Sequence, residues 1–188
     1  MAGRPLAPSP ESPPTPKSPA PSPKSLIYDP AMSPADAELT IEAASEDERE
    51  WAAALMARSE PWITLRRDLE QCRIACRRPE YLLFVAHQSG RPCGFVLLHP
   101  RGVAGSPYLA SIAVAEEFRG TGVGTRLLDF VERFFRPQAR HLFLCVSSFN
   151  PRARALYERH GYRVVGELED YVIEGASELL MHKPLGRS

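Results

Sequence analysis

The pattern of apolar and polar positions predicts a strand followed by a helix from residue 39 onward. Residues 39–43 (Leu-Thr-Ile-Glu-Ala) alternate between apolar and polar side chains, which is the period of a strand with one buried face. Ser45 is followed three residues later by Glu48, and this spacing is typical of a capping box at the start of a helix. We expect that helix to extend to about Arg58 and to bury Leu55.

A stripe of four apolar side chains predicts a second helix. The stripe consists of Leu65, Leu69, Cys72 and Cys76. These positions recur at i, i+4, i+7 and i+11, so they share one face of a helix that ends near Arg78 and Pro79. The spacing of the two cysteines would also bring two thiols together on that face. No histidine or second cysteine pair completes a zinc shell, and we therefore predict no metal site.

The rest of the chain alternates between strand and helix patterns. Further strands are predicted at residues 81–87, 93–99, 108–114, 141–146, 162–166 and 178–182, and further helices at 121–135 and 152–160. The first two of these strands are joined by a Ser-Gly-Arg-Pro turn at residues 89–92, and a loop is expected at 101–107. The predicted order is β-α-α-β-β-β-α-β-α-β-β. This order predicts an α/β fold of the α+β type, with a mixed sheet of about seven strands, antiparallel in its first half, and helices as crossovers.

The N-terminal segment differs from everything that follows it. Eleven of the 19 prolines lie between Pro5 and Pro34, among serine, alanine and lysine. Such a segment lacks the apolar surface that would offset the entropy of ordering it, so we predict a disordered tail over residues 1–36 and a folded domain over 37–185. A proline-rich ligand for an adaptor domain is the alternative for the tail. Translation starting at Met32 instead of Met1 also stays open.

Composition removes several classes of function. The 188 residues carry 23 Lys and Arg against 23 Asp and Glu, so no general positive field favours nucleic acid. No apolar stretch reaches the roughly 18 residues that a membrane helix requires. The four cysteines show no paired spacing and no secretory leader precedes them, which predicts reduced thiols in a cytoplasmic protein. The sequence leaves open whether the protein is a monomer or a homodimer.

The segment most informative about function is a glycine-rich turn between a strand and a helix. It runs Arg119, Gly120, Thr121, Gly122, Val123, Gly124, Thr125. Glycines at this place allow close approach of a ligand, and the unpaired N–H groups of a helix start favour an anion such as phosphate. The segment matches neither a P-loop nor a dinucleotide fingerprint, because it lacks Gly-Lys-Ser/Thr and has Thr125 where a glycine is required. A turn that only tightens the strand–helix connection is the alternative.

Two motifs of the chain resemble those of the GNAT superfamily, the acetyl-CoA-dependent N-acetyltransferases. Residues 111–124 (SIAVAEEFRGTGVG) are similar to its acetyl-CoA signature, R/Q-x-x-G-x-G/A. Residues 150–162 (NPRARALYERHGY) are similar to its second motif, an Asn followed by a helix that ends Leu-Tyr-Glu-x-x-Gly-Tyr/Phe. The resemblance extends over about residues 39–183. It implies a GNAT-like, mostly antiparallel twisted sheet with helices on both faces, and acetyl-CoA as the co-substrate.

The resemblance also implies roles for single residues. Backbone groups of Ile112, Ala113 and Val114 would pair with pantetheine amides, and the N–H groups of residues 120–125, with Arg119, would hold the pyrophosphate. Asn150 would hydrogen-bond the pantetheine arm. Tyr157 would protonate the departing thiolate as a general acid. The alternatives are a helix cap for Asn150 and a core aromatic for Tyr157.

The general base is the point at which this sequence departs from the pattern. Ribosomal-protein-alanine N-acetyltransferases, which the chain otherwise resembles, carry Glu at the position of Cys145. A buried thiol is a poor acceptor for the proton of an ammonium, and an acyl-cysteine intermediate would lack an activating histidine. Glu60, Asp170 and solvent water are the candidates. An acceptor α-amine, with a pKa near 8, would make deprotonation easier than a lysine near 10.4.

The remaining candidate residues belong to the acceptor side. Glu60 and Trp62 in the connection between the first two helices, and Asp170 and Tyr171 before the last strand, lie where the resemblance places the acceptor groove. A carboxylate or an aromatic face there would bind an ammonium. The function predicted is direct transfer of an acetyl group from acetyl-CoA to the primary amine of a peptide N-terminus, a lysine or a small molecule. The alternative is a non-catalytic GNAT-like module that senses acyl-CoA or binds a partner.

Overall fold

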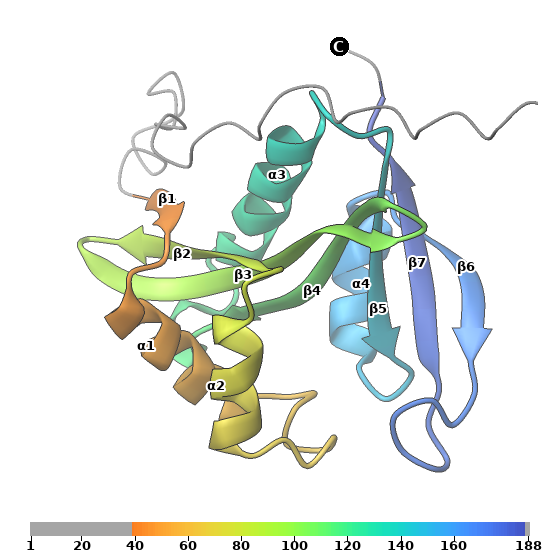
Figure 1. The fold of residues 1–188 in the computed structure, drawn as a ribbon, viewed down its shortest axis with the longest axis horizontal. Coiled ribbons are helices and arrows are strands. Elements are labelled where there is room, and N and C mark those ends of the chain that lie inside the picture. The colour runs from red at the N-terminus through yellow and green to blue at the C-terminus, as the bar shows by residue number, and fades with distance from the viewer. Residues whose placement is uncertain (1–38, 187–188) are drawn as a thin grey trace, which may run out of the picture.

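The fold is one seven-stranded sheet with helices on both faces (Figure 1). A computed structural model describes residues 39–186. The strands are β1 (Leu39–Ala43), β2 (Leu82–Gln88), β3 (Arg91–Val103), β4 (Ser106–Val114), β5 (His141–Ser147), β6 (Arg163–Leu168) and β7 (Glu178–Pro184). The helices are α1 (Glu46–Ala57), α2 (Leu69–Arg77), the short 3-10 helix η2 (Glu116–Phe118), α3 (Val123–Phe135) and α4 (Pro151–Arg159). The predicted order and class of fold are confirmed, with η2 as an addition.

The sheet is split in its middle, between β4 and β5. The strand order is β1-β2-β3-β4-β5-β7-β6, and every neighbouring pair is antiparallel except β4 and β5. This parallel pair is joined only at Tyr108 opposite Phe143 and at Leu109 opposite Leu144. Directly after these pairs, Ala110 is an extra residue in β4 relative to β3, which is a β-bulge. The following residues of β4 therefore have no neighbouring strand on the β5 side among the elements that the structure describes.

Each face of the sheet has its own hydrophobic core. Helices α3 and α4 cover one face, where Leu127 and Tyr157 pack against alternate residues of the strands. Helices α1 and α2 cover the opposite face, over residues such as Val85 and Phe95. Gly94 of β3 lets α3 approach closely, because a Cβ there would lie 2.9 Å from the Ala113 carbonyl oxygen and 3.0 Å from a methyl of Leu127.

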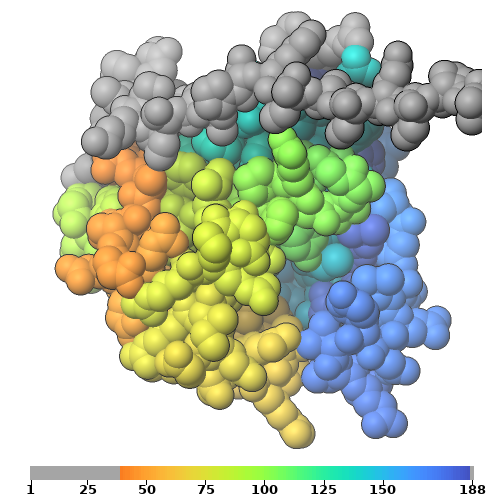
Figure 2. Space-filling model, in the orientation of Figure 1, coloured from red at the N-terminus to blue at the C-terminus, as the bar shows by residue number. Residues whose placement is uncertain are grey.

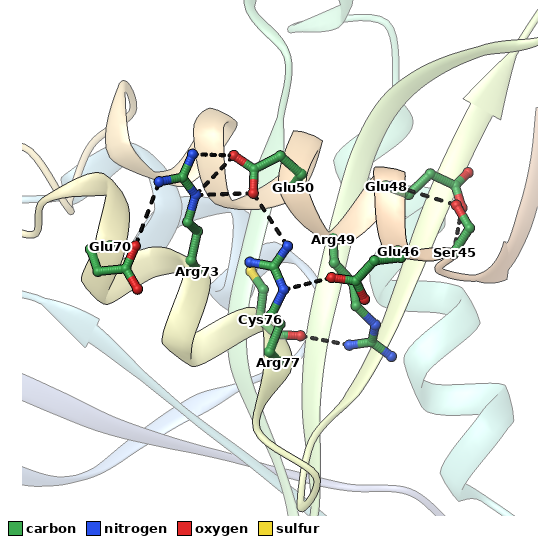
Figure 3. Close-up of polar contacts among 9 residues, drawn as sticks. All are labelled: Ser45, Glu46, Glu48, Arg49, Glu50, Glu70, Arg73, Cys76 and Arg77. Atoms are coloured by element: carbon green, nitrogen blue, oxygen red, sulfur yellow. Dashed lines mark hydrogen bonds and ion pairs between the residues drawn. The ribbon is translucent and has the colours of Figure 1, made fainter.

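Helices α1 and α2 each begin with a side-chain cap, and ion pairs between exposed side chains connect the two helices. Ser45 and Glu48 form the predicted capping box, and Asp68 forms another at the start of α2. The Asp68 cap starts α2 at Leu69. Leu65, which we predicted as part of this helix, therefore lies in the turns before it. Between the helices, arginines of α2 bind glutamates of α1 (Figure 3). These pairs involve Glu46, Glu50, Arg73 and Arg77.

The connections between β2, β3 and β4 are tighter than the sequence indicated. The turn after β2 contains only Ser89 and Gly90, both with positive φ, so the predicted turn residues 91–92 belong to β3. The loop expected at 101–107 is a second two-residue hairpin, in which Ala104 and Gly105 have positive φ. Two consecutive residues with positive φ match the right-handed twist of the strands on either side, so the strands continue up to the turn.

The structure bears on the predictions for the cysteines, metal ligands and membrane helices only within residues 39–186. The predicted tail at 1–36 lies outside the described residues. The four cysteines are free thiols, and Cys72 and Cys76 are buried in the α1–α2 core as predicted for the stripe. Among residues 39–186, no cluster of three or more potential metal ligands is present. Within the same range, no helix combines the length and apolar character needed to cross a membrane.

Candidate active site

A cavity of about 920 Å³ lies where β4 and β5 separate. Its walls come from β4, the glycine-rich turn, the ends of β5 and α4, the start of β7, and two loops. One loop connects α1 to α2 and the other connects β6 to β7. In Figure 2 the yellow and blue surfaces of these loops face each other at the lower edge of the molecule. The split in the sheet therefore gives the cavity access to both faces.

The glycine-rich turn presents a helix start to the cavity. Gly120 and Gly122 have φ of +84° and +92°, and Gly122 is the N-cap of α3, without a side chain that could cap it. The backbone N–H groups of the first turn thus keep their capacity to bind an anion. Arg119 donates from Nε to the carbonyl of Val114 at 3.2 Å, which holds its guanidinium beside the turn.

The seven residues predicted for this turn differ in whether they line the cavity. Five of them line the cavity: Arg119, Gly120, Gly122, Gly124 and Thr125. The side chain of Val123 is buried in the core, and the Thr121 hydroxyl donates to the carbonyl of Phe118 at 2.7 Å. The helix also starts two residues later than predicted, at Val123, because the left-handed conformation of Gly122 ends the preceding turn.

Residues 112–114 of β4 form an open strand edge in the cavity wall. Ile112, Ala113 and Val114 are paired with β3 on one side, opposite Val96, Phe95 and Gly94. They lie beyond the last β4–β5 pair, so no strand within residues 39–186 covers their other side. An open edge of this kind accepts an extended ligand with amide groups as an added strand.

Helix α4 contributes Asn150 and Tyr157 to the cavity. Asn150 caps α4 by accepting a hydrogen bond from the N–H of Ala153 at 3.2 Å, so the cap predicted as an alternative is present, and its side chain also lines the cavity. Tyr157 is 6% exposed, and burial raises its pKa above the usual range of a phenol. It packs edge-on against Tyr162 and reaches the cavity from the α3–α4 face. Burial therefore keeps the phenol protonated at neutral pH, so a proton is present at this wall of the cavity.

On β5, Cys145 lies in the cavity wall beside the side chain of Tyr108. Burial raises the pKa of the Cys145 thiol, and the nearby Glu178 carboxylate raises it further. Burial also raises the pKa of Tyr108, and Cys145 is the next contributor. Burial therefore makes the thiol a poor proton acceptor at neutral pH, and the expectation that Cys145 does not replace a glutamate as base stays a prediction.

The start of β7 adds a buried carboxylate that the sequence analysis did not select. Glu178 is 9% exposed, lines the cavity, and accepts a hydrogen bond from the Ser147 hydroxyl at 2.5 Å. Burial raises the pKa of Glu178, although the Ser147 hydrogen bond acts in the opposite direction. Tyr108 and Glu178 were missed because each begins a predicted strand, and Ser147 was missed because it follows directly after one. The one available signal was an acidic residue directly before the apolar run Leu-Leu-Met.

The four predicted acceptor-side residues come from the two loops at the cavity mouth. Glu60 and Trp62 line the cavity, and Glu60 accepts a hydrogen bond from the N–H of Thr64 at 3.3 Å. Tyr171 also lines it and is 68% exposed. Asp170 is not part of the lining, and its carboxylate accepts a hydrogen bond from the N–H of Gly175 at 2.6 Å within the β6–β7 loop. The fold thus brings three of the four together and gives Asp170 a place in the loop.

The chain belongs to the GNAT family of acetyltransferases. The model of this family matches residues 41–162, which is more than half of the chain and includes both motifs. An uncharacterized N-acetyltransferase of Methanocaldococcus jannaschii is 35% identical over 102 residues, or 53% of this chain and 64% of that protein. An N-alpha-acetyltransferase of Saccharolobus solfataricus is 35% identical over 80 residues, or 42% of this chain and 48% of that protein. The chain therefore spans about half to just under two thirds of the length of these two curated relatives, at 48% and 64%.

Solved structures agree with the fold. The ribosomal-protein-S18-alanine N-acetyltransferase of Escherichia coli matches with a TM-score of 0.65 and 20% identity, over 80% of this chain and 96% of that one. An aminoglycoside 6'-N-acetyltransferase complexed with coenzyme A matches with a TM-score of 0.63 and 17% identity, over 79% and 98% of the two chains. The likeness at this level of identity concerns the fold, and the predicted GNAT-like sheet is thereby confirmed.

Proposed function

We propose that this protein is an N-acetyltransferase that transfers the acetyl group of acetyl-CoA directly to the α-amino group of a peptide. The observation that carries the proposal is one cavity that joins a phosphate-type helix start, an open strand edge and a buried phenol. These features suit the pyrophosphate, the pantetheine amides and the leaving sulfur of one donor. Family membership and the relatives named N-alpha-acetyltransferases support the same activity.

The residues of the cavity fit a CoA thioester in a defined order. The first turn of α3, with Arg119 beside it, would bind the pyrophosphate. The free edge at residues 112–114 would bind the pantetheine as an added strand, and Asn150 would hold its end. Tyr157 would then lie at the sulfur and give its proton to the thiolate that leaves. The proposed transfer is direct, and burial disfavours an acyl-cysteine because it raises the pKa of the Cys145 thiol.

The proposed acceptor class is supported by the part of the cavity that the α1–α2 and β6–β7 loops line. Trp62 and Tyr171, on two different loops, contribute aromatic rings to the lining there, and the exposed Glu60 side chain also lines the cavity. Such a lining admits an extended peptide end, and the carboxylate favours its ammonium group. The α-amine is favoured over lysine because its pKa of about 8 leaves more neutral amine at pH 7.

The direct test is release of CoA from acetyl-CoA by the purified full-length chain. Three acceptors are compared: a lysine-free peptide with an N-terminal alanine, an N-terminally blocked peptide that contains lysine, and spermidine. We expect turnover with the first and little with the others. Turnover with lysine or spermidine alone would overturn the α-amine acceptor and keep the acetyltransferase.

Calorimetry of acetyl-CoA binding distinguishes the alternative of a non-catalytic sensor. Binding without turnover of any acceptor would support the sensor and contradict the enzyme. A control variant, Gly122→Arg, places a Cβ at φ +92°, a conformation that side chains rarely adopt, and bulk at the helix start. We expect it to abolish donor binding. Full binding by this variant would contradict the role of the glycine-rich turn.

A further inference from the structure

The proposed reaction needs a group that removes a proton from the acceptor ammonium, and the described residues offer one buried carboxylate in the cavity. Glu178 is 9% exposed and lines the cavity. No ion pair within residues 39–186 involves it, and its hydrogen-bond partner there is the Ser147 hydroxyl. A buried carboxylate without a cationic partner is costly for stability, so its place at a cavity wall points to a chemical role.

The register of β5 and β7 fixes where Glu178 lies relative to the rest of the site. Glu178 is directly opposite Ser147, and the next pair on the same face is Cys145 opposite Leu180. Paired residues of neighbouring strands place their side chains on the same face, with diagonal neighbours roughly 7 Å apart. Glu178 is therefore next to the position at which ribosomal-protein-alanine N-acetyltransferases, by the resemblance, carry their glutamate.

Glu178 and Tyr157 reach the cavity from opposite faces of the sheet. Leu144, Val146 and Leu179 belong to the core under α3 and α4, as does Tyr157. Because strand side chains alternate, Ser147 and Glu178 point to the other face, on which the α1–α2 loop lies. A base on one face and an acid on the other keep apart the two proton transfers that the reaction needs, one from the attacking nitrogen and one to the leaving sulfur.

The other candidate bases are less suitable in this structure. The Glu60 side chain lies in an exposed loop, where its carboxylate accepts the N–H of Thr64. Asp170 faces its own loop and does not line the cavity. Cys145 keeps its proton because burial raises its pKa.

We propose that Glu178 is the general base of the acetyl transfer, and that Ser147 is a positioning residue that holds its carboxylate. This inference rests on the proposed function. The Ser147 hydroxyl occupies Oε1 at 2.5 Å and leaves Oε2 to face the acceptor nitrogen, directly or through one water. The base has thus moved from β5 to the adjacent strand β7, while the carboxylate stays at the same wall of the cavity.

Two side chains, Glu178 and Tyr157, accept and donate the protons that the reaction moves. One N–H bond of the acceptor ammonium breaks and its proton goes to Glu178. The freed nitrogen forms a bond to the thioester carbonyl carbon, the C–S bond breaks, and the sulfur takes the hydroxyl proton of Tyr157. The second proton lost from the nitrogen returns to Tyr157 through water, and Glu178 releases its proton to solvent. The net products are an amide, CoA with a thiol, and one proton.

The surroundings of Glu178 adjust its proton affinity to this task. Burial raises its pKa toward neutrality, and a base with a pKa closer to the working pH accepts a proton more effectively. The groups that face it are the Ser147 hydroxyl from β5, the Cys145 thiol from β5 and the Tyr108 phenol from β4. Both of the last two groups are neutral at pH 7, because the pKa of each is raised by burial.

The test is the pH dependence of kcat/KM for Glu178→Gln with the alanine-initiated, lysine-free peptide. At pH 7, where about a tenth of an α-amine is neutral, we expect a loss of about 100-fold relative to the unaltered chain. At pH 9.5 the amine is already neutral and needs no base, so the loss should shrink to less than about 10-fold. A merely structural role of Glu178 would give the same loss at every pH.

Two further variants serve as controls. Glu178→Asp keeps a carboxylate at the site, so it should recover part of the rate and the pH dependence of the unaltered chain. Glu174→Gln removes an exposed carboxylate of the neighbouring loop and should leave the rate unchanged. Calorimetry of acetyl-CoA binding for each variant shows that the donor site is intact.

The outcomes separate the two proposals. Turnover by the unaltered chain, with a Glu178→Gln variant that is equally active or equally impaired at all pH values, overturns the base and keeps the acetyltransferase. No turnover by the unaltered chain with any of the three acceptors overturns the enzyme, and the base with it. A loss that disappears at alkaline pH supports both.

Discussion

A buried glutamate carboxylate lies at each end of β7, and the two carboxylates differ in the group that binds them. At the C-terminal end, Lys183 binds both carboxylate oxygens of Glu132 from α3 at 2.6 and 2.7 Å. At the N-terminal end, Glu178 has the neutral hydroxyl of Ser147. Glu132 and Glu178 are almost equally buried, at 6% and 9% exposure. Burial alone therefore does not distinguish them.

The difference shows which end of the strand serves stability and which serves chemistry. A paired carboxylate under a helix fixes α3 onto the sheet and has no free oxygen for a ligand. An unpaired one costs stability and persists where another use requires it. The end with the uncompensated charge is also the end at the cavity. Breaking each end separately should thus change different properties.

The largest expected effect on stability is at the Lys183 end. Lys183→Met would leave the Glu132 carboxylate buried without its cation, and removal of one partner of a buried pair costs about 3 kcal/mol or more. Urea unfolding at pH 7, followed by circular dichroism, measures this loss. Adding Glu132→Leu should return much of it, because the remaining groups are then both apolar. A Lys183→Met variant as stable as the unaltered chain would show that the pair is not structural.

A second contrast concerns two buried tyrosines. Tyr157→Phe should lower kcat by about 10- to 100-fold without weakening acetyl-CoA binding, since it removes the proposed acid and leaves the packing. Tyr162 packs against Tyr157, and its hydroxyl is buried with no partner among the described residues. Tyr162→Phe should therefore leave kcat unchanged. Equal kcat values for the two variants would remove Tyr157 from the mechanism.

How much of the site the sequence predicts depends on how far apart along the chain the interacting residues lie. The glycine-rich turn, Asn150 and Tyr157 were found because they are local patterns at fixed spacing, and the elements around them follow from periodicity. The start of α2 was misplaced because an apolar stripe continues past the Asp68 cap. Leu65 extended the helical period by chance, and no local rule excludes such a coincidence.

The carboxylate of Glu178 shows why the rest was out of reach. Its importance comes from Ser147, which is 31 residues away in the chain and adjacent only through the β5–β7 register. The sequence predicts both strands but not their pairing, because β6 intervenes in the chain and lies at the edge of the sheet. The same holds for the Lys183–Glu132 pair, which joins residues 51 positions apart.

The stability of Glu178→Gln gives a third, smaller prediction with the opposite sign to Lys183→Met. Burial raises the folded-state pKa of Glu178 above its ordinary value, so the folded state loses stability as the pH rises from the ordinary value through the raised one. The glutamine variant does not titrate and should be more stable by about 1 kcal/mol at pH 8. Below pH 4 the difference should vanish. A destabilised variant at pH 8 would mean that the carboxylate is structural.

The smallest effect on stability is expected for the exposed ion pairs of Arg77 between α1 and α2, which differ from the buried contacts at both ends of β7. Arg77 of α2 binds Glu46 at 2.6 Å and Glu50 at 3.3 Å, but all three side chains are exposed to solvent (Figure 3). Water and salt already stabilise such charges, and Arg73 still neutralises Glu50 when Arg77 is removed. Arg77→Ala should therefore leave the urea midpoint within experimental error and kcat unchanged. A loss similar to that of Lys183→Met would mean that ion pairs stabilise the α1–α2 face as strongly as they do the buried end of β7.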